Sequence, residues 1–106
     1  MAESLFIIDL HYLAALEELD SAMASHVAFL DKHYEAGHFI TSGRKVPRTG
    51  GIILAVADSK QEAETWMNED PFVKLRLSNF TVTEFLASKS DPAFKKLLKD
   101  LNRKAK

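Results

Sequence analysis

The sequence predicts an α+β domain built on a four-stranded antiparallel sheet, and two observations lead to this fold class. Residues 52–57 (IILAVA) are apolar at every position, so a strand there would bury both of its faces. From Leu13 onward, apolar residues instead recur every three or four positions, which is the period of a helix. Along the whole chain these patterns give the order strand, helix, strand, strand, helix, strand. That order is the ferredoxin-like βαββαβ arrangement, with the first and third strands in the middle of the sheet.

The first half of the chain contains a strand, a long helix and a hairpin. The strand is predicted over residues 4–11, where Phe6, Ile8 and Leu10 make one face apolar. The other face begins with Leu5 and Ile7 and becomes polar at Asp9 and His11. The helix that follows ends near Gly37, a residue type suited to a helix C-terminus. Its apolar stripe comprises Leu13, Leu16, Leu19, Met23, Val27, Leu30 and Tyr34. A hairpin over residues 37–57 then joins the second and third strands through a loop rich in Gly, Pro and basic residues.

The second half is marked by helix start signals. Residues 59–62 (SKQE) have the form of a capping box and predict a second, shorter helix. Asp70-Pro71 pairs an N-cap residue with proline at the first helical position and predicts a short helical turn before a fourth strand over residues 79–86. Asp91-Pro92 repeats the signal and starts an amphipathic tail. We therefore divide the chain into a domain over residues 1–88 and a C-terminal helical tail over residues 89–106.

Two helices cover only one face of such a sheet, and the central strands are apolar on both. The second face therefore needs a cover, and a second copy of the chain can supply one by packing sheet against sheet. We expect a homodimer through this open face. The alternative is that the C-terminal helix folds back over the open face of its own sheet.

Composition and charge argue against several classes of protein. The formal net charge is −1, with 46% hydrophobic and 27% charged residues, so neither nucleic acid nor membrane is expected as a partner. The chain has no cysteine, which excludes disulfides and thiolate chemistry. Its histidines lack the spacing of a metal-binding motif, so no metal is expected. The N-terminal residues resemble neither a signal peptide nor a membrane span, and we expect a cytoplasmic protein.

Four short motifs, taken in order, resemble the YciI-like (YCII-related) family. They are residues 25–30 (SHVAFL), Ser42-Gly43, residues 48–51 (RTGG) and residues 69–72 (EDPF), and the similarity extends over about residues 5–85. The resemblance implies a dimeric α+β barrel of the muconolactone isomerase-like superfamily.

The resemblance also implies a His–Asp dyad, which falls on His26 and Asp70 in this chain. A characterised member of the family dehydrochlorinates a hydroxylated aromatic ring without a cofactor, so no cofactor is expected here. The chain departs from the family pattern at two positions. Met23 stands where some members have arginine, and Arg44 stands where many have proline.

The candidate dyad has structural explanations as well. His26 lies about 60° around the helix from the line of the apolar stripe, so it borders the buried side. It serves as a general base if a carboxylate orients it, or as a structural histidine bonded to a backbone carbonyl. Asp70 is explained by helix capping alone, but one of its oxygens can cap while the other meets His26. Asp9, on a central strand, is the rival orienting group and a further candidate contact for the substrate.

Ser42, Gly43 and Arg44 at the end of the second strand are candidate substrate-binding residues. Ser42 can donate a hydrogen bond, and Arg44, Lys45 or Arg48 can attract an anionic ligand. The simpler alternative is that the glycine permits the turn and the basic hairpin tip is solvated.

The leading functional hypothesis is a cofactor-independent lyase or isomerase in which His26 and Asp70 transfer a proton on a small oxygenated molecule, anionic or aromatic. The alternative is a non-catalytic homodimer, either structural or binding a small ligand. Nucleic-acid binding through the basic tail is a third hypothesis, and it would require an affinity that collapses with added salt.

Overall fold

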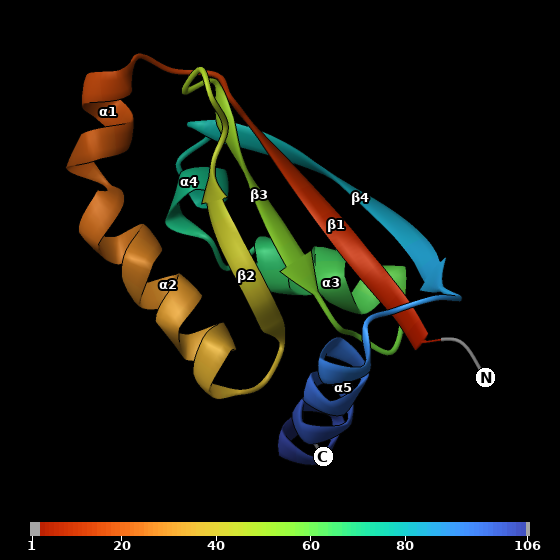
Figure 1. Cartoon of the computed structure of the whole chain (residues 1–106). Helices are drawn as coiled ribbons and strands as arrows, with labels where there is room; N and C mark the ends of the chain where they lie inside the picture. The colour runs from red at the N-terminus through yellow and green to blue at the C-terminus, as the bar shows by residue number, and fades with distance from the viewer. Residues whose placement is uncertain (1–2, 106) are drawn as a thin grey trace.

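The computed structural model describes residues 3–105, and their side chains as far as residue 102. The elements are β1 (Glu3–Tyr12), α1 (Leu16–Ser21), α2 (Met23–Glu35), β2 (Phe39–Arg44), β3 (Gly50–Ala55), α3 (Lys60–Met67), α4 (Pro71–Lys74), β4 (Ser78–Ala87) and α5 (Pro92–Ala105) (Figure 1). Residues 1, 2 and 106, the ends of the expected domain and tail, lie outside the described residues. No helix within the described residues is both long and apolar enough to cross a membrane.

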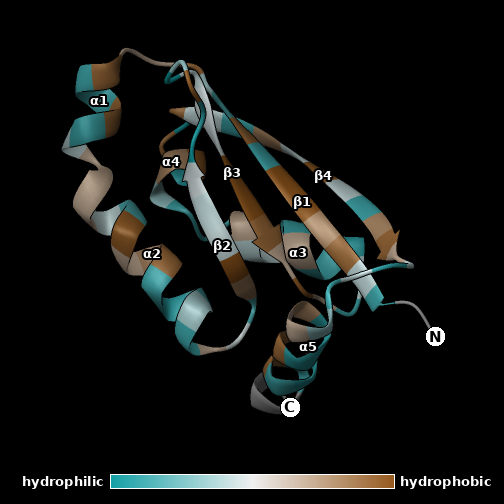
Figure 2. Ribbon diagram, in the orientation of Figure 1, coloured by the Kyte–Doolittle hydropathy of each residue, from teal (hydrophilic) through white to brown (hydrophobic). Residues whose placement is uncertain are grey.

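The four strands form one antiparallel sheet in the order β2-β3-β1-β4, which confirms the predicted α+β fold. The two central strands are those whose sequences are apolar on both faces, and Figure 2 shows their middle portions as hydrophobic. Ile8 pairs with Ile53 of β3 on one side and with Val82 of β4 on the other. β3 ends at Ala55, so the last two residues of the apolar run predicted as a strand lie beyond it.

The single long helix predicted after β1 is wrong in one respect, because the chain turns at Ala22 and forms two helices. Ala22 has φ −99° and ψ 3°, and its N–H bonds to Leu19 three residues back rather than four. Next to the turn, the hydroxyl of Ser21 donates to the carbonyl of Glu17, a bond that tends to bend helices. Leu19 and Ala22 are buried together with Phe72 at the end of the sheet. The break between α1 and α2 thus coincides with a buried contact between this part of the chain and Phe72.

The predicted helix starts are confirmed by their hydrogen bonds. Ser59 Oγ accepts from the Glu62 N–H at 3.0 Å, and the Glu62 side chain accepts through Oε1 from the Asp58 N–H at 3.0 Å. Asp70 Oδ1 caps α4 by accepting from the Phe72 N–H at 3.0 Å. Asp91 accepts from the Ala93 N–H at 2.8 Å at the start of α5. These starts are encoded by residues close in sequence, and they appear where the sequence places them.

The main core lies between the sheet and the helices α2 and α3. Its buried residues are Phe6, Ile8, Leu10, Phe29, Phe39, Ile53, Ala55, Ala63, Met67 and Val82. From α2 the core takes Phe29, and His33 is buried on the same side of that helix. The predicted apolar stripe is only partly buried. Leu19 is fully buried and Leu30 and Tyr34 pack against the main core, whereas Leu13, Leu16 and Val27 are 57%, 41% and 43% exposed.

The C-terminal helix α5 packs on the other face of the sheet, at the end where β1 begins and β4 ends (Figure 1). Leu98 is buried against Leu5 and Val56 in a second apolar cluster. The alternative prediction, that the C-terminal helix folds back over the open face of its own sheet, is therefore confirmed for this end of the face. Ile7 and Phe85, also on the open face, are still 36% and 39% exposed.

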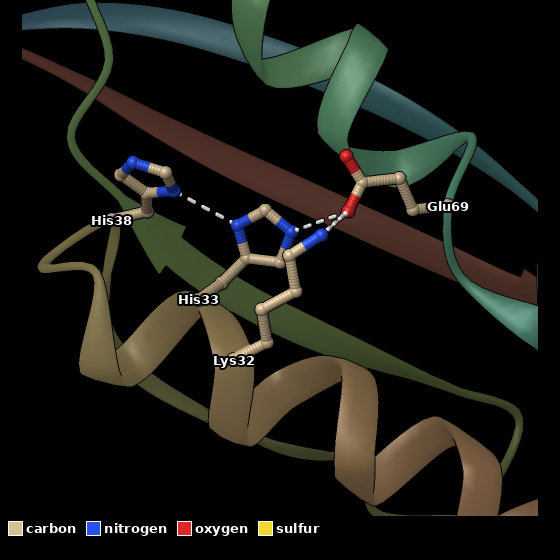
Figure 3. A network of polar contacts seen from close by, with 4 residues as sticks. All are labelled: Lys32, His33, His38 and Glu69. Carbon is tan, nitrogen blue, oxygen red and sulfur yellow. Dashed lines mark hydrogen bonds and ion pairs between the residues drawn. The ribbon is translucent and has the colours of Figure 1, made fainter.

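Two histidine–carboxylate pairs attach α2 to the turn between α3 and α4. His26 bonds to Asp70, and His33, two helical turns further along, bonds through Nε2 to Glu69 Oε1 at 3.0 Å. Lys32 Nζ donates to the same Glu69 oxygen at 3.0 Å, and His33 Nδ1 lies 2.8 Å from His38 Nδ1 (Figure 3). We call the His26–Asp70 and His33–Glu69 pairs the double clamp. It holds one side of α2 against the turn.

The hydrogen bonds of the second pair set the role of one nitrogen of His33. A carboxylate only accepts, so His33 donates to Glu69 through Nε2. Between His33 and His38 a single proton is shared, and either Nδ1 can donate it to the other. The His38 ring is stacked on Trp66 with centroids 3.8 Å apart. Burial, followed by the charge of His33, lowers the pKa of His38 below its ordinary value of 6.5, although Glu62 and Glu69 oppose the shift. Burial raises the pKa of Glu69, but the bonds from Lys32 and His33 outweigh it and leave that pKa lowered.

We predict that His38 makes the fold sensitive to mild acid. A base with a lower pKa in the folded state takes up its proton more readily when unfolded, so its stabilisation falls as the pH drops through the ordinary value of 6.5. Urea unfolding at pH 7.5 and 5.5 should show a smaller loss of stability for His38→Asn, whose side-chain amide can still donate to His33. His11→Asn, at an exposed histidine, serves as the control. Equal losses in the wild type and His38→Asn would contradict the prediction.

Candidate functional site

A cavity of about 500 Å³ lies between α2 and the half of the sheet formed by β2 and β3. This size suits a small organic ligand. It is lined by Leu10, Tyr12, Asp20, Met23, His26, Val27, Leu30, Ser42, Gly43, Arg44, Arg48, Gly51, Ile52, Ile53 and Phe72. The lining is mostly apolar with a few polar groups, as is usual for such sites.

The apolar stripe of α2 forms one wall of this cavity. Met23, Val27 and Leu30 all line it, and they recur at the helical spacing seen in the sequence. The periodicity therefore detected an apolar helix face correctly, but that face borders an open space. The core takes the neighbouring side of the helix, with Phe29 and His33.

His26 lies on the cavity wall and is hydrogen bonded to Asp70, with Nδ1 2.9 Å from Oδ1. The side chains are 12% and 0% exposed, so the bond is shielded from water. Asp70 Oδ1 also accepts the capping bond from the Phe72 N–H, so one oxygen serves both roles. The expected division of the two roles between the two oxygens is wrong. Oδ2 is buried and has no hydrogen-bond partner among the described residues.

Phe72 holds the imidazole from one side. Its ring lies parallel to that of His26, with centroids 4.0 Å apart and planes 4° apart. Asp70 and Phe72 are both placed by the first turn of α4, so the Asp-Pro start fixes the group that bonds the imidazole and the ring that it stacks on. With Nδ1 donating to the carboxylate, the other nitrogen of neutral His26, Nε2, carries the lone pair. No hydrogen bond to Nε2 is present within residues 3–105.

The three predicted substrate-binding residues of β2 all line the same cavity. Ser42 faces α2, and its Oγ lies 2.7 Å from the hydroxyl of Tyr34. Arg44 is exposed and brings a positive charge to the cavity. A Cβ at Gly43 would meet nothing within 4 Å, so there is room for a side chain at this position and crowding does not explain the glycine.

Asp9 does not belong to this site. It lies on the open face of the sheet, where its carboxylate forms an ion pair with Lys45 at 2.6 Å. The expectation that Asp9 orients His26 or contacts a ligand in this cavity is not met, because alternation along β1 directs it away from α2. Lys45 supplies the partner that a carboxylate on a central strand requires.

Tyr12, Asp20 and Arg48 complete the polar part of the lining. Arg48 Nη2 donates to Asp20 Oδ1 at 2.7 Å, and this bond raises the pKa of Arg48 above its already high ordinary value. The guanidinium carbon lies 6.0 Å from the centre of the Tyr12 ring. Tyr12 continues the alternation of Phe6, Ile8 and Leu10 on β1, so the sequence places it on the same face of the sheet as these residues. The pairing of Asp20 with Arg48 leaves no local signal in the sequence.

Gly50 is required by close packing of the backbone. A Cβ there would lie 1.9 Å from the carbonyl oxygen of Leu10, so only glycine allows β3 to begin this close to β1. The Gly50-Gly51 pair therefore has a structural cause in the sheet next to the cavity. Within the described residues, no group of three or more His, Cys, Asp or Glu side chains is placed to hold a metal ion.

Two solved structures share the fold. One is 5-chloro-2-hydroxyhydroquinone dehydrochlorinase (TftG) from Burkholderia phenoliruptrix AC1100 in complex with 2,5-dihydroxybenzoquinone, with a TM-score of 0.65 and 22% identity over 74% of this chain and 90% of that one. The other is SnoaB, a cofactor-independent oxygenase from Streptomyces nogalater, with a TM-score of 0.50 and 18% identity over 87% of this chain and 99% of that one. At these identities the likeness establishes the fold alone.

A search among proteins of curated function finds no match. The model of the YCII-related domain, in contrast, matches residues 5–86, which is most of the chain and includes both members of the His26–Asp70 pair. The chain therefore belongs to the YCII-related domain family.

Proposed function

We propose that this protein is a cofactor-independent enzyme that transfers a proton on a small oxygenated ring compound, with His26 as the base and Asp70 as the residue that positions it. One observation carries the proposal: the imidazole on the cavity wall is bonded through Nδ1 to a fully buried carboxylate. This arrangement leaves Nε2 as the basic nitrogen and gives it a defined direction.

The proton transfer follows from this geometry. Nε2 takes a proton from a hydroxyl or an activated C–H group of the bound ring, and the positive charge that forms on the imidazole lies 2.9 Å from the Asp70 carboxylate. The negative charge is left on the ring oxygens. Returning the proton to a different atom completes an isomerisation, and expelling a leaving group in its place completes an elimination. The parallel Phe72 ring keeps the imidazole plane fixed during both steps.

The cavity lining fits an oxygenated ring. Apolar side chains from α2 and the sheet can enclose the ring, while Ser42 and Arg44 offer a hydroxyl and a cation to its oxygens. Gly43 lies between these two residues and contributes backbone. TftG, named for its action on a chlorinated hydroxyhydroquinone, supports this substrate class, and SnoaB, a cofactor-independent oxygenase, supports a reaction without a cofactor.

A non-catalytic role is the second candidate, and the cap formed by Asp70 favours it. The same Oδ1 atom starts α4 and holds α2, so the pair stabilises the fold whatever else it does. In that case the protein would be a structural homodimer or would bind a small ligand without converting it.

We also propose that the protein forms a homodimer through the open face of the sheet. The helix α5 covers only one end of this face, where Leu98 meets Leu5. Phe85, the cross-strand partner of Leu5, is still 39% exposed on this face. Further along the strands Ile7 and Ile52 are 36% and 37% exposed, and a second sheet would bury all three side chains.

Substitution of His26 tests the proposed reaction. In D₂O, the wild type should speed the exchange of the ring hydrogens of hydroxyhydroquinone for deuterium, which NMR measures. It should also release chloride from 5-chloro-2-hydroxyhydroquinone, which an ion-selective electrode measures. His26→Gln should lower both rates by about 100-fold or more, since a positioned base is worth at least that much. His11→Gln, at an exposed histidine of β1, should keep the wild-type rates.

The melting temperature separates the two candidates. If folded His26→Gln retains the wild-type rates, or if no reaction is detected and the variant only lowers the melting temperature, the catalytic role is wrong and the structural role is supported.

The dimer is tested by a charge on the open face. The wild type should have twice the 11.9 kDa chain mass by light scattering, and Ile7→Glu should have the single mass because it would bury a carboxylate between two sheets. Val46→Glu, at a hairpin-tip residue that is 96% exposed, makes a comparable change away from this face and should remain dimeric. A wild-type monomer at high concentration would refute the proposal.

A further inference from the structure

The ion pair between Asp20 and Arg48 spans two separate parts of the cavity lining. Asp20 is on α1, and Arg48 is in the loop between β2 and β3, 28 positions further along the chain. Both residues line the cavity, and their bond is 2.7 Å long. Of the lining residues in the described part of the chain, Asp20 alone is acidic.

We infer that Asp20 occupies the place of an anionic group of the ligand, and that Arg48 exchanges Asp20 for a ligand carboxylate when the cavity is filled. Arg48 thereby selects ring compounds that carry a carboxylate over neutral ones. This inference rests on the proposed function of the cavity as a ligand site, and it adds the charge of the ligand and the residue that reads it.

The exposure of the pair makes such an exchange feasible. The Asp20 side chain is 59% exposed and that of Arg48 is 21% exposed, and an ion pair this open to water contributes little net stability. A released Asp20 carboxylate would be hydrated at once. The attraction between a ligand carboxylate and the same guanidinium is stronger inside the cavity, because the partly apolar enclosure has a lower effective dielectric constant than bulk water. The lost hydration of the carboxylate offsets part of this gain.

The guanidinium also has donors to spare. Arginine carries five N–H donors in a planar fork, and the bond to Asp20 Oδ1 is made by Nη2. A carboxylate can accept two parallel bonds from such a fork, which gives it an advantage over a singly bonded partner. Arg44 lines the same cavity and adds a second positive charge.

A series of ring contacts connects Arg48 to His26. The guanidinium lies over the ring of Tyr12, which meets Phe72 edge to face at 6.1 Å, and Phe72 is stacked on His26. Tyr12 keeps Arg48 at the cavity after Asp20 leaves. Arg48 and His26 line the same cavity, so a ligand held at Arg48 lies in the same space as the proposed base.

Two probe molecules that differ only in a carboxylate test the inference. Gentisate (2,5-dihydroxybenzoate) and hydroquinone are titrated by calorimetry into the full chain at low salt. The wild type should bind gentisate more tightly. Asp20→Asn should strengthen gentisate binding by about threefold or more, because the competing anion is gone, and Arg48→Gln should weaken it by about tenfold. Neither change should alter hydroquinone binding.

Lys45→Gln provides the matched control. It removes one positive charge from the same loop, but Lys45 pairs with Asp9 on the opposite face of the sheet, so gentisate binding should not change. Circular dichroism establishes that each variant is folded.

The outcomes separate this inference from the proposed function. Weaker gentisate binding by Asp20→Asn would mean that Asp20 only positions Arg48, and it would overturn the exchange. Equal binding of both probes, or no effect of Arg48→Gln, would overturn the inference and leave the ligand site and the role of His26 intact. No binding of either probe to the wild type would overturn the inference together with the cavity as a site for such rings.

Discussion

The double clamp between α2 and the turn before α4 is the contact on which the cavity and its chemistry depend. Glu69 and Asp70 are neighbours in sequence, but they bond to histidines seven residues apart, about 10 Å along the helix. The helix is thus fixed at two points along one side. Its other side, with Met23 and Val27, is free to stand away from β2 and β3 and to border a cavity.

The clamp also joins stability to function. Asp70 caps α4, bonds to His26 and is fully buried, so the residue proposed to orient the base is one that the fold itself requires. Neither His33 nor Glu69 lines the cavity, and their bond holds the turn that also carries Asp70. A change in His33 or Glu69 therefore reaches the site through the backbone, at a distance from the chemistry.

Local and periodic signals predicted most of the fold, because they depend on residues near one another in sequence. The strands apolar on both faces are central in the sheet, and the capping motifs begin helices where expected. The break at Ala22 was missed because it arises from packing against Phe72, 50 positions away. At the site, the family resemblance pointed to His26 and Asp70, whereas the Asp20–Arg48 pair and the His33–His38–Glu69 network join residues from separate elements. Asp9 was misplaced because alternation gives the two faces of a strand without showing which one borders the cavity.

The central claim is that Asp70 holds His26 with its proton on Nδ1 and its lone pair on Nε2, facing the cavity. The ¹⁵N chemical shifts of the His26 ring, measured by long-range ¹H–¹⁵N correlation at a pH where the ring is neutral, report the tautomer directly. The account predicts a protonated Nδ1 and an unprotonated Nε2, with that preference weakened in Asp70→Asn. A neutral ring protonated on Nε2 in the wild type would contradict it, because His26 would then have no basic nitrogen to offer a ligand.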